Sequence, residues 1–298
     1  MAPDGGGGAG AGAPALPAGG GLPTPGGGAG PVVRRASLLG VRVDLPSRAE
    51  ALALLSERLR GPAPGLLLVT TVNAECLAIA AADPAYRRTL NGAGLNLVDG
   101  AGVALALALK GVDGVERLPG AEMVWEVAGL CQREGARLFL LGATPSVLAE
   151  ASRRLARRFP GLAVEGFAPP FSPDHRFPSA AERETLGHIR RFAPQVLCVA
   201  LGMPKQELWA QGHRRRLEAL GVRVAVGVGG ALDYIAGRMP PPPAAVRGLG
   251  LEWAYRLLRE PRRRLGRQAT RLPRFLALAL AEALRERLGP STGRERLC

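Results

Sequence analysis

Short apolar runs recur along the chain, and most are followed by a longer stretch with helical spacing. Strands are predicted at residues 38–43, 65–70, 95–99, 137–142, 164–167, 196–202 and 222–227. Apolar strands that alternate with helices are typical of a parallel sheet with helices on both faces. We therefore predict an α/β fold with a Rossmann-like, mostly parallel sheet.

Several of the expected helices have clear start signals. Ser47 and Asp83-Pro84 each precede a helix, and Thr144-Pro145 combines a capping side chain with a proline at the first helical position. Further helices are expected after Asn73 and Asp99. These polar residues end predicted strands, so they belong to the carboxyl edge of the sheet, where open α/β sheets bind ligands.

Composition divides the chain into three parts. Residues 1–33 are rich in Gly, Pro and Ala and carry almost no charge, so we expect them to be disordered. Residues 34–243 hold the predicted α/β domain, which ends at the proline run Pro240–Pro243. Residues 244–298 are predicted to form a basic, amphipathic, helical appendage.

Much of the positive charge lies in that appendage. Thirteen arginines and five glutamates between Arg247 and Cys298 contribute +8 to a formal net charge of +14 for the whole chain. Leucines and aromatic residues such as Trp253 and Phe275 are interspersed with these arginines. Such a segment fits an anionic membrane surface. A solvated basic helix or a nucleic-acid patch fits the charge equally well.

The remaining composition disfavours several classes of protein. Arginine carries nearly all the basic charge in a chain also rich in Ala, Gly and Pro, and aromatic residues are scarce, which weakens a nucleic-acid reading. The four cysteines form no CxxC pair, so we expect neither a metal site nor a cofactor. We see no signal peptide and no uninterrupted apolar run of about 18 residues, and expect a cytoplasmic protein that lies on a membrane.

The candidate general base is Asp99, where an apolar strand gives way to Asp99-Gly100-Ala101-Gly102. A carboxylate at that edge can take a proton from a substrate hydroxyl, but an aspartate there can also cap the following helix. Thr71 and Asn73 end the preceding strand and can bind sugar hydroxyls or an acyl amide. Capping of the helix after Asn73 is the alternative.

Two further strand ends offer groups for phosphate or sugar oxygens. Lys205 and Gln206 follow one apolar strand, and Lys205 is one of only two lysines in the chain. The turn Gly227–Ala231 follows another, and its backbone could cradle a phosphate. Leu232 occupies the last glycine position of a dinucleotide fingerprint, so that motif is absent. There is also no DxD pair to hold a metal on a nucleotide sugar.

Seven motifs in order, spanning about residues 39–280, resemble those of the WecG/TagA/CpsF glycosyltransferases. They are Thr71-Val72-Asn73-Ala74-Glu75, Val98-Asp99-Gly100-Ala101-Gly102, Glu116-Arg117-Leu118-Pro119-Gly120, Phe139-Leu140-Leu141-Gly142, Ala200-Leu201-Gly202-Met203-Pro204-Lys205-Gln206-Glu207, Gly227-Val228-Gly229-Gly230 and Leu249-Gly250-Leu251-Glu252-Trp253-Ala254-Tyr255-Arg256. Each motif alone is weak, but seven in register are specific.

The resemblance implies an inverting, metal-independent transfer of an N-acetylmannosamine-type sugar from a UDP-sugar to an undecaprenyl-diphosphate-linked saccharide at the cytoplasmic membrane. It puts Asp99 in the base position and makes Arg256 and Arg263 candidate catalytic arginines of a membrane-packed appendage. The expected substrate-binding residues are Thr71, Asn73, Arg117, Gly142, Lys205, Gln206, Gly229 and Gly230.

The expected partners are therefore a UDP-sugar, a polyprenyl-diphosphate-linked acceptor and an anionic membrane surface, without nucleic acid and with a homo-oligomer left open. Three other classes compete with this interpretation. A nucleic-acid-binding protein explains the charge but not the polar strand ends, and a nucleotide-dependent oxidoreductase lacks its glycine fingerprint. A catalytically inactive membrane scaffold would not need Asp99.

Overall fold

The computed structural model describes residues 33–62, 65–170, 179–240, 242–243, 246, 252–259 and 261–288, apart from the side chains of Arg256, Arg262, Arg263, Arg264 and Arg267. Nearly all of the segment predicted to be disordered, 1–33, lies outside these residues. The strands are β1 Arg35–Leu38, β2 Val41–Asp44, β3 Leu67–Val72, β4 Leu95–Val98, β5 Leu138–Gly142, β6 Val164–Phe167, β7 Val196–Ala200 and β8 Val224–Gly227. The helices are α1 Arg48–Arg60, α2 Ala74–Ala82, α3 Pro84–Asn91, α4 Ala101–Leu109, α5 Gly120–Glu134, α6 Pro145–Arg158, α7 Ser179–Phe192, α8 Lys205–Gly212, α9 Arg214–Ala219, α10 Ala231–Ile235, α12 Glu252–Arg259 and α13 Pro261–Leu288.

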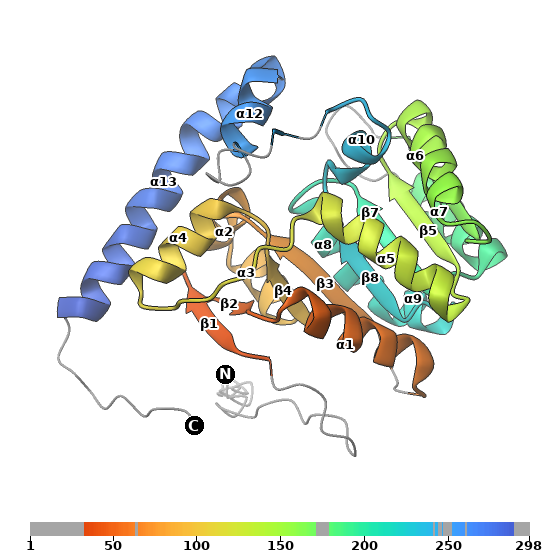
Figure 1. Cartoon of the computed structure of the whole chain (residues 1–298), viewed down its shortest axis with the longest axis horizontal. Helices are drawn as coiled ribbons and strands as arrows, with labels where there is room; N and C mark the ends of the chain where they lie inside the picture. Colours follow the sequence, from red (N-terminus) through yellow and green to blue (C-terminus); the bar gives the residue numbers. More distant parts are fainter. Residues whose placement is uncertain are drawn as a thin grey trace, which may run out of the picture.

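Six strands form one sheet in the order β4-β3-β8-β7-β5-β6, and every pair is parallel. The predicted α/β class is confirmed. Because the strands are parallel, their carboxyl ends share one edge of the sheet. Figure 1 shows the arrowheads of the strands directed toward the side of the molecule that carries α10 and α12.

Alternate side chains of the strands enter two different apolar cores, as the pleat of a strand requires. Leu138 and Leu140 of β5 pack with α1, α5, α6 and α10, whereas Phe139 and Leu141 pack with α7, α8 and α9. Strands that are apolar on both sides read as continuous apolar runs, which is why the sequence revealed them.

The predicted single strand at 38–43 is wrong in one respect. The segment is an antiparallel hairpin, with β1 and β2 joined by Leu39 and Gly40. Both turn residues have positive φ, 54° and 72°, as a two-residue turn of this hand requires. A leucine rarely adopts that conformation, so Leu39 is not recognisable in the sequence as a turn residue.

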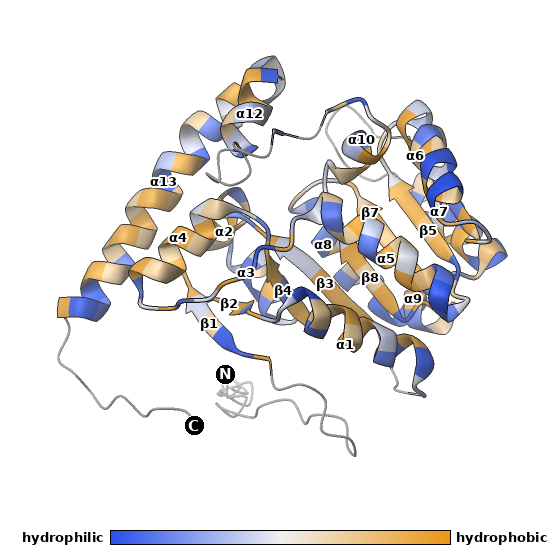
Figure 2. Cartoon of the chain, viewed as in Figure 1, coloured by the Kyte–Doolittle hydropathy of each residue, from blue (hydrophilic) through white to orange (hydrophobic). Residues whose placement is uncertain are grey.

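A third apolar cluster joins the β1–β2 hairpin, α2, α3 and α4 to the C-terminal helix α13. Phe275, Ala279 and Ala283 of α13 are buried there, so this helix packs against the sheet domain. Figure 2 shows apolar residues along both α4 and α13, which lie side by side. Within the described ranges, every helix is too short or too polar to cross a bilayer.

Candidate functional site

Asp99 and Asn73 meet where β4 and β3 end. Val72 of β3 is in register with Val98 of β4, and the Asp99 backbone N–H donates to the Val72 carbonyl at 2.9 Å. The two residues that follow these strands are therefore neighbours at the carboxyl edge. Both are partly buried, so their side chains can reach a ligand while being held by the protein.

The amide of Asn73 acts at both of its ends. Its Oδ1 accepts from the Cys76 backbone N–H at 3.0 Å and caps α2, which is the helix-capping alternative. Its Nδ2 also donates to Asp99 Oδ2 at 3.4 Å. The cap thus fixes the orientation in which Asn73 presents a donor to the carboxylate.

Asp99 does not occupy the capping position of the helix that follows it. The N-cap of α4 is Gly100, and α4 has no side-chain capping hydrogen bond. The alternative reading of Asp99 as a helix cap therefore loses its support. The carboxylate lies at the sheet edge with one oxygen held by the amide of Asn73, an arrangement suited to a general base.

Thr71 connects β3 to the turn after β8. Its hydroxyl donates to the Gly227 carbonyl at 3.2 Å, and the residue is only 7% exposed. A Cβ on Gly120, at the start of α5, would lie 3.4 Å from this hydroxyl oxygen. Thr71 is thus enclosed between two strand ends and a helix start.

Gln206 contacts the inner side of the turn that follows β8. The Gln206 side chain is buried, and its Oε1 accepts from the Gly229 backbone N–H at 2.9 Å. Gly229 has a φ of +52°, and the space beyond its Cβ position is open. The outer side of this turn is accessible to a ligand while its inner side is fixed.

The other predicted binding residues lie at the same edge. Lys205 begins α8, the helix that follows β7, and Gly230 precedes α10. Gly142 ends β5 with a φ of +108°, and a Cβ there would lie 2.6 Å from the carbonyl oxygen of Ala200 in β7. Close packing of the two strands therefore accounts for Gly142, and its role in substrate binding stays a prediction.

Arg117 links this edge to the appendage. Its Nη1 donates to Glu252 Oε1, at the start of α12, over 2.8 Å. The adjacent Leu118 N–H donates to the carbonyl of Val98 at 2.7 Å, which brings this segment to the end of β4 beside Asp99. Helix α12 of the appendage is therefore held close to the candidate base.

The two arginines expected to be catalytic lie on the helices of the appendage. Arg256 belongs to α12 and Arg263 to α13, but their side chains lie outside the described residues. Their roles stay predictions.

Glu207 belongs to one of the seven motifs, but no role is predicted for it from the sequence. It is 2% exposed, next to Gln206, and its pKa is raised because burial disfavours the charged form. The signal was present in the sequence, because helical spacing puts 206 and 207 on the same side of α8 as the buried Trp209 and Ala210.

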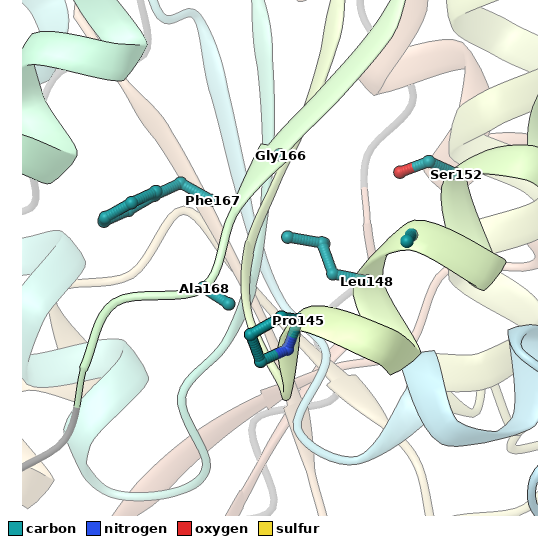
Figure 3. A pocket seen from close by; sticks show the side chains of 7 residues that line it. Pro145, Leu148, Ser152, Gly166, Phe167 and Ala168 are labelled. Atoms are coloured by element: carbon teal, nitrogen blue, oxygen red, sulfur yellow. The ribbon is translucent and has the colours of Figure 1, made fainter.

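A shallow pocket lies between α6 and β6, beside the outer strand of the sheet that is farthest from β4. Figure 3 shows Pro145 and Leu148 of α6 beside Ala168, which follows β6. Because β6 and β4 are the two outer strands of the sheet, this pocket is remote from Asp99. The residues that line this pocket are apolar except for Ser152, so it offers no acid or base for catalysis.

Comparison with known proteins agrees with this geometry. The profile described as Glycosyl transferase WecG/TagA/CpsF family matches residues 36–289. A Staphylococcus aureus strain MW2 protein named N-acetylglucosaminyldiphosphoundecaprenol N-acetyl-beta-D-mannosaminyltransferase is 29% identical over 229 residues, which are 77% of this chain and 86% of that protein. A protein of the same name from strain NCTC 8325 / PS 47 is 29% identical over 224 residues, 75% of this chain and 84% of its own length.

Proposed function

Because the chain belongs to the WecG/TagA/CpsF family and is a glycosyltransferase, we propose that it transfers an N-acetylmannosamine-type sugar from a UDP-sugar to an undecaprenyl-diphosphate-linked saccharide. The names of its relatives give the sugar and an acceptor that carries N-acetylglucosamine on diphosphoundecaprenol. The observation that carries the proposal is the Asn73–Asp99 pair at the carboxyl edge of a parallel sheet.

Asp99 acts as the general base. Its carboxylate takes the proton of the acceptor hydroxyl while the acceptor oxygen attacks the anomeric carbon of the donor. The bond from that carbon to the phosphate oxygen breaks, and UDP leaves from the opposite face with the bonding electron pair. The configuration at the anomeric carbon is inverted. Asn73 donates to one oxygen of Asp99 and so orients the carboxylate at the sheet edge.

Arginines and backbone N–H groups stabilise the leaving diphosphate in place of a metal. Arg117 is well placed for this role because it lies at the sheet edge and contacts α12. Arg256 and Arg263 are the appendage arginines that we assign to the diphosphate. The glycine turn at 227–230 receives the donor on its open side.

The appendage, residues 244–298, seats the enzyme on the inner face of the cell membrane. Leu276, Leu280 and Leu284 of α13 are each about half exposed. Removal of a leucine side chain from water is favourable, so these exposed leucines are suited to an apolar partner. Arg274 and Arg285 are exposed on the same helix. Leucines that enter the acyl region and arginines that meet phosphates suit a bilayer that carries the acceptor.

The test is a transfer assay with UDP-N-acetylmannosamine and a polyprenyl-diphosphate-linked N-acetylglucosamine, read as UDP release and as lipid-linked disaccharide. Asp99→Asn should lose about 100-fold or more in kcat, the usual scale of a general base, and should still bind the donor. Asp113→Asn is the matched control, because Asp113 is an exposed acid beyond α4. Activity should persist in EDTA.

Undiminished turnover by Asp99→Asn would remove Asp99 from the role of base. Loss of activity in EDTA that added Mg²⁺ restores would contradict the arginine-based stabilisation of the leaving group. Release of free sugar without disaccharide would refute the proposed acceptor.

A further inference from the structure

Glu207 is a buried acid directly beneath the glycine turn, and its setting is unusual. Its Oε1 accepts from Gln206 Nε2 at 2.7 Å, whereas its Oε2 has no hydrogen-bond partner among the described residues. The groups that lower its pKa are the Gln206 amide, its own backbone and the Tyr86 hydroxyl, and their effect is smaller than that of burial. Burial therefore raises the pKa of Glu207 despite these hydrogen bonds, because a buried carboxylate is costly when its hydrogen bonds do not replace its hydration.

The Gln206 amide is committed at both ends. Nε2 donates to Glu207, and Oε1 accepts from the Gly229 N–H at 2.9 Å. An amide can rotate by 180° unless its neighbours distinguish oxygen from nitrogen. Here Glu207 Oε1 faces the amide nitrogen and the Gly229 N–H faces the amide oxygen, so the two neighbours favour the same orientation. The acid thereby holds the Gln206 amide in the orientation that presents its oxygen to the Gly229 N–H.

The two side chains also contact the end of β8 itself. A Cβ on Gly227 would lie 2.9 Å from Gln206 Nε2 and 3.2 Å from Glu207 Oε1. Gly227 in turn accepts from the Thr71 hydroxyl at 3.2 Å. The inner side of the turn is therefore fixed by three side chains, while the outer side at Gly229 is open.

The acid is also close to the residues that hold the candidate base. The Tyr86 hydroxyl lowers the pKa of Glu207 and lies 3.2 Å from the Cys76 sulfur. The backbone N–H of Cys76 donates to Asn73, and Asn73 donates to Asp99. Glu207 thus lies between the glycine turn and the residues Tyr86 and Cys76, which lead to Asn73.

We propose that Glu207 is a positioning residue for the transfer reaction, which acts through Gln206 to hold the turn Gly227–Gly230 in the conformation that receives the sugar donor. The proposal rests on the proposed function for the identity of the donor. Glu207 itself does not touch the substrate. Its requirement is an acceptor oxygen that faces Gln206 Nε2, and a negative charge is not needed.

The test compares Glu207→Gln with Glu207→Leu in the full chain. The glutamine variant keeps an acceptor oxygen of the same reach, so its donor KM should stay within about threefold of the wild type. The leucine variant removes the acceptor and frees the amide to rotate, so its donor KM should rise by about tenfold or more, with a smaller change in kcat. A role in general stability would not separate KM from kcat in this way.

Hydrogen exchange provides a readout that needs no activity. The peptide that contains Gly229 should exchange faster in Glu207→Leu than in the wild type, and at the wild-type rate in Glu207→Gln. If Glu207→Leu does not fold, Gln206→Met serves instead, because it removes the amide and keeps the volume. It should produce the same two changes.

Two results would overturn the proposal. One is a leucine variant with unchanged donor KM and unchanged exchange at Gly229. The other is a glutamine variant as impaired as the leucine variant, which would mean that the charge of Glu207 matters. If the wild type transfers no sugar at all, the proposed function fails, while the exchange data still decide whether Glu207 holds the turn.

Discussion

Phe275 is the side chain on which the docking of α13 should depend. It is fully buried, and its ring lies 3.6 Å from the position of a Cβ on Gly102 in α4. The other buried apolar side chains in the described part of α13 are those of Ala279 and Ala283, which bury little area. Phe275→Ala therefore removes most of the apolar contact that holds this helix to the sheet domain.

The expected magnitude follows from the size of the deletion. Truncation of a buried phenylalanine to alanine costs about 3–5 kcal/mol, which lowers the docking equilibrium of α13 by roughly two to three and a half powers of ten. The remaining polar contacts join Lys110 to Glu282 at 2.6 Å and to Glu286 at 2.9 Å, and Arg271 to Glu75. Ion pairs near a surface contribute at most about 1 kcal/mol each, so they offset only part of the loss.

Hydrogen exchange of the full chain, followed peptide by peptide, measures the effect. Peptides of α13 should exchange much faster in Phe275→Ala, while those of the central strands should be unchanged. Sugar transfer should fall with docking if the appendage completes the active site. Leu276→Ala is the matched control, because Leu276 is the next residue, is 49% exposed and should affect vesicle binding instead.

Slow exchange of α13 in Phe275→Ala would refute the reasoning about docking. Fast exchange of α13 together with full transfer activity would refute the role of the appendage in the active site. A Leu276→Ala variant with the exchange pattern expected of Phe275→Ala would mean that the two faces of α13 are wrongly assigned.

Three further predictions concern the sheet edge. Asn73→Asp keeps the cap of α2 but places a second carboxylate beside Asp99, so kcat should fall about tenfold to a hundredfold with little change in the urea midpoint. Arg117→Gln and Glu252→Gln should show a coupling of about 0.5–1 kcal/mol in a double-mutant cycle on α12 exchange; additive effects would deny the pair a docking role. Because burial raises the pKa of Glu207, its stabilising contribution is complete below its unfolded pKa of about 4.5 and is lost as pH rises through the folded pKa, by up to about 1.4 kcal/mol per pH unit. Urea unfolding between pH 4 and pH 8 should show this slope in the wild type and not in Glu207→Gln.

The parallel sheet could be predicted because both faces of its strands are covered, which produces continuous apolar runs that end in polar residues. Asp99 and Asn73 were recognised for the same reason. Their contact, however, depends on the pairing of β3 with β4 in register, which one sequence does not reveal. The bond from Gln206 to Gly229 likewise depends on β7 and β8 being neighbours.

The hydrogen-bond partners of individual side chains were harder to predict than the positions of the residues in the fold. The sequence left Asn73 as either a cap or a ligand-binding residue, and the structure uses its oxygen for the cap and its nitrogen for Asp99. The sequence does not single out Glu207, because an acid on a helix is usually exposed. Only the buried face of α8 distinguishes it from such a residue.

Three acids of the appendage pair with basic residues of the sheet domain. Glu252 pairs with Arg117, and Glu282 and Glu286 both pair with Lys110, so these acids face the sheet domain. Acids that face inward hold the appendage to the basic residues of the domain, and they leave Arg274 and other arginines on exposed positions. The net charge is therefore a poor guide to this segment, because these acids, together with Arg271, which pairs with Glu75, specify where it docks, while exposed arginines such as Arg274 remain for an anionic partner.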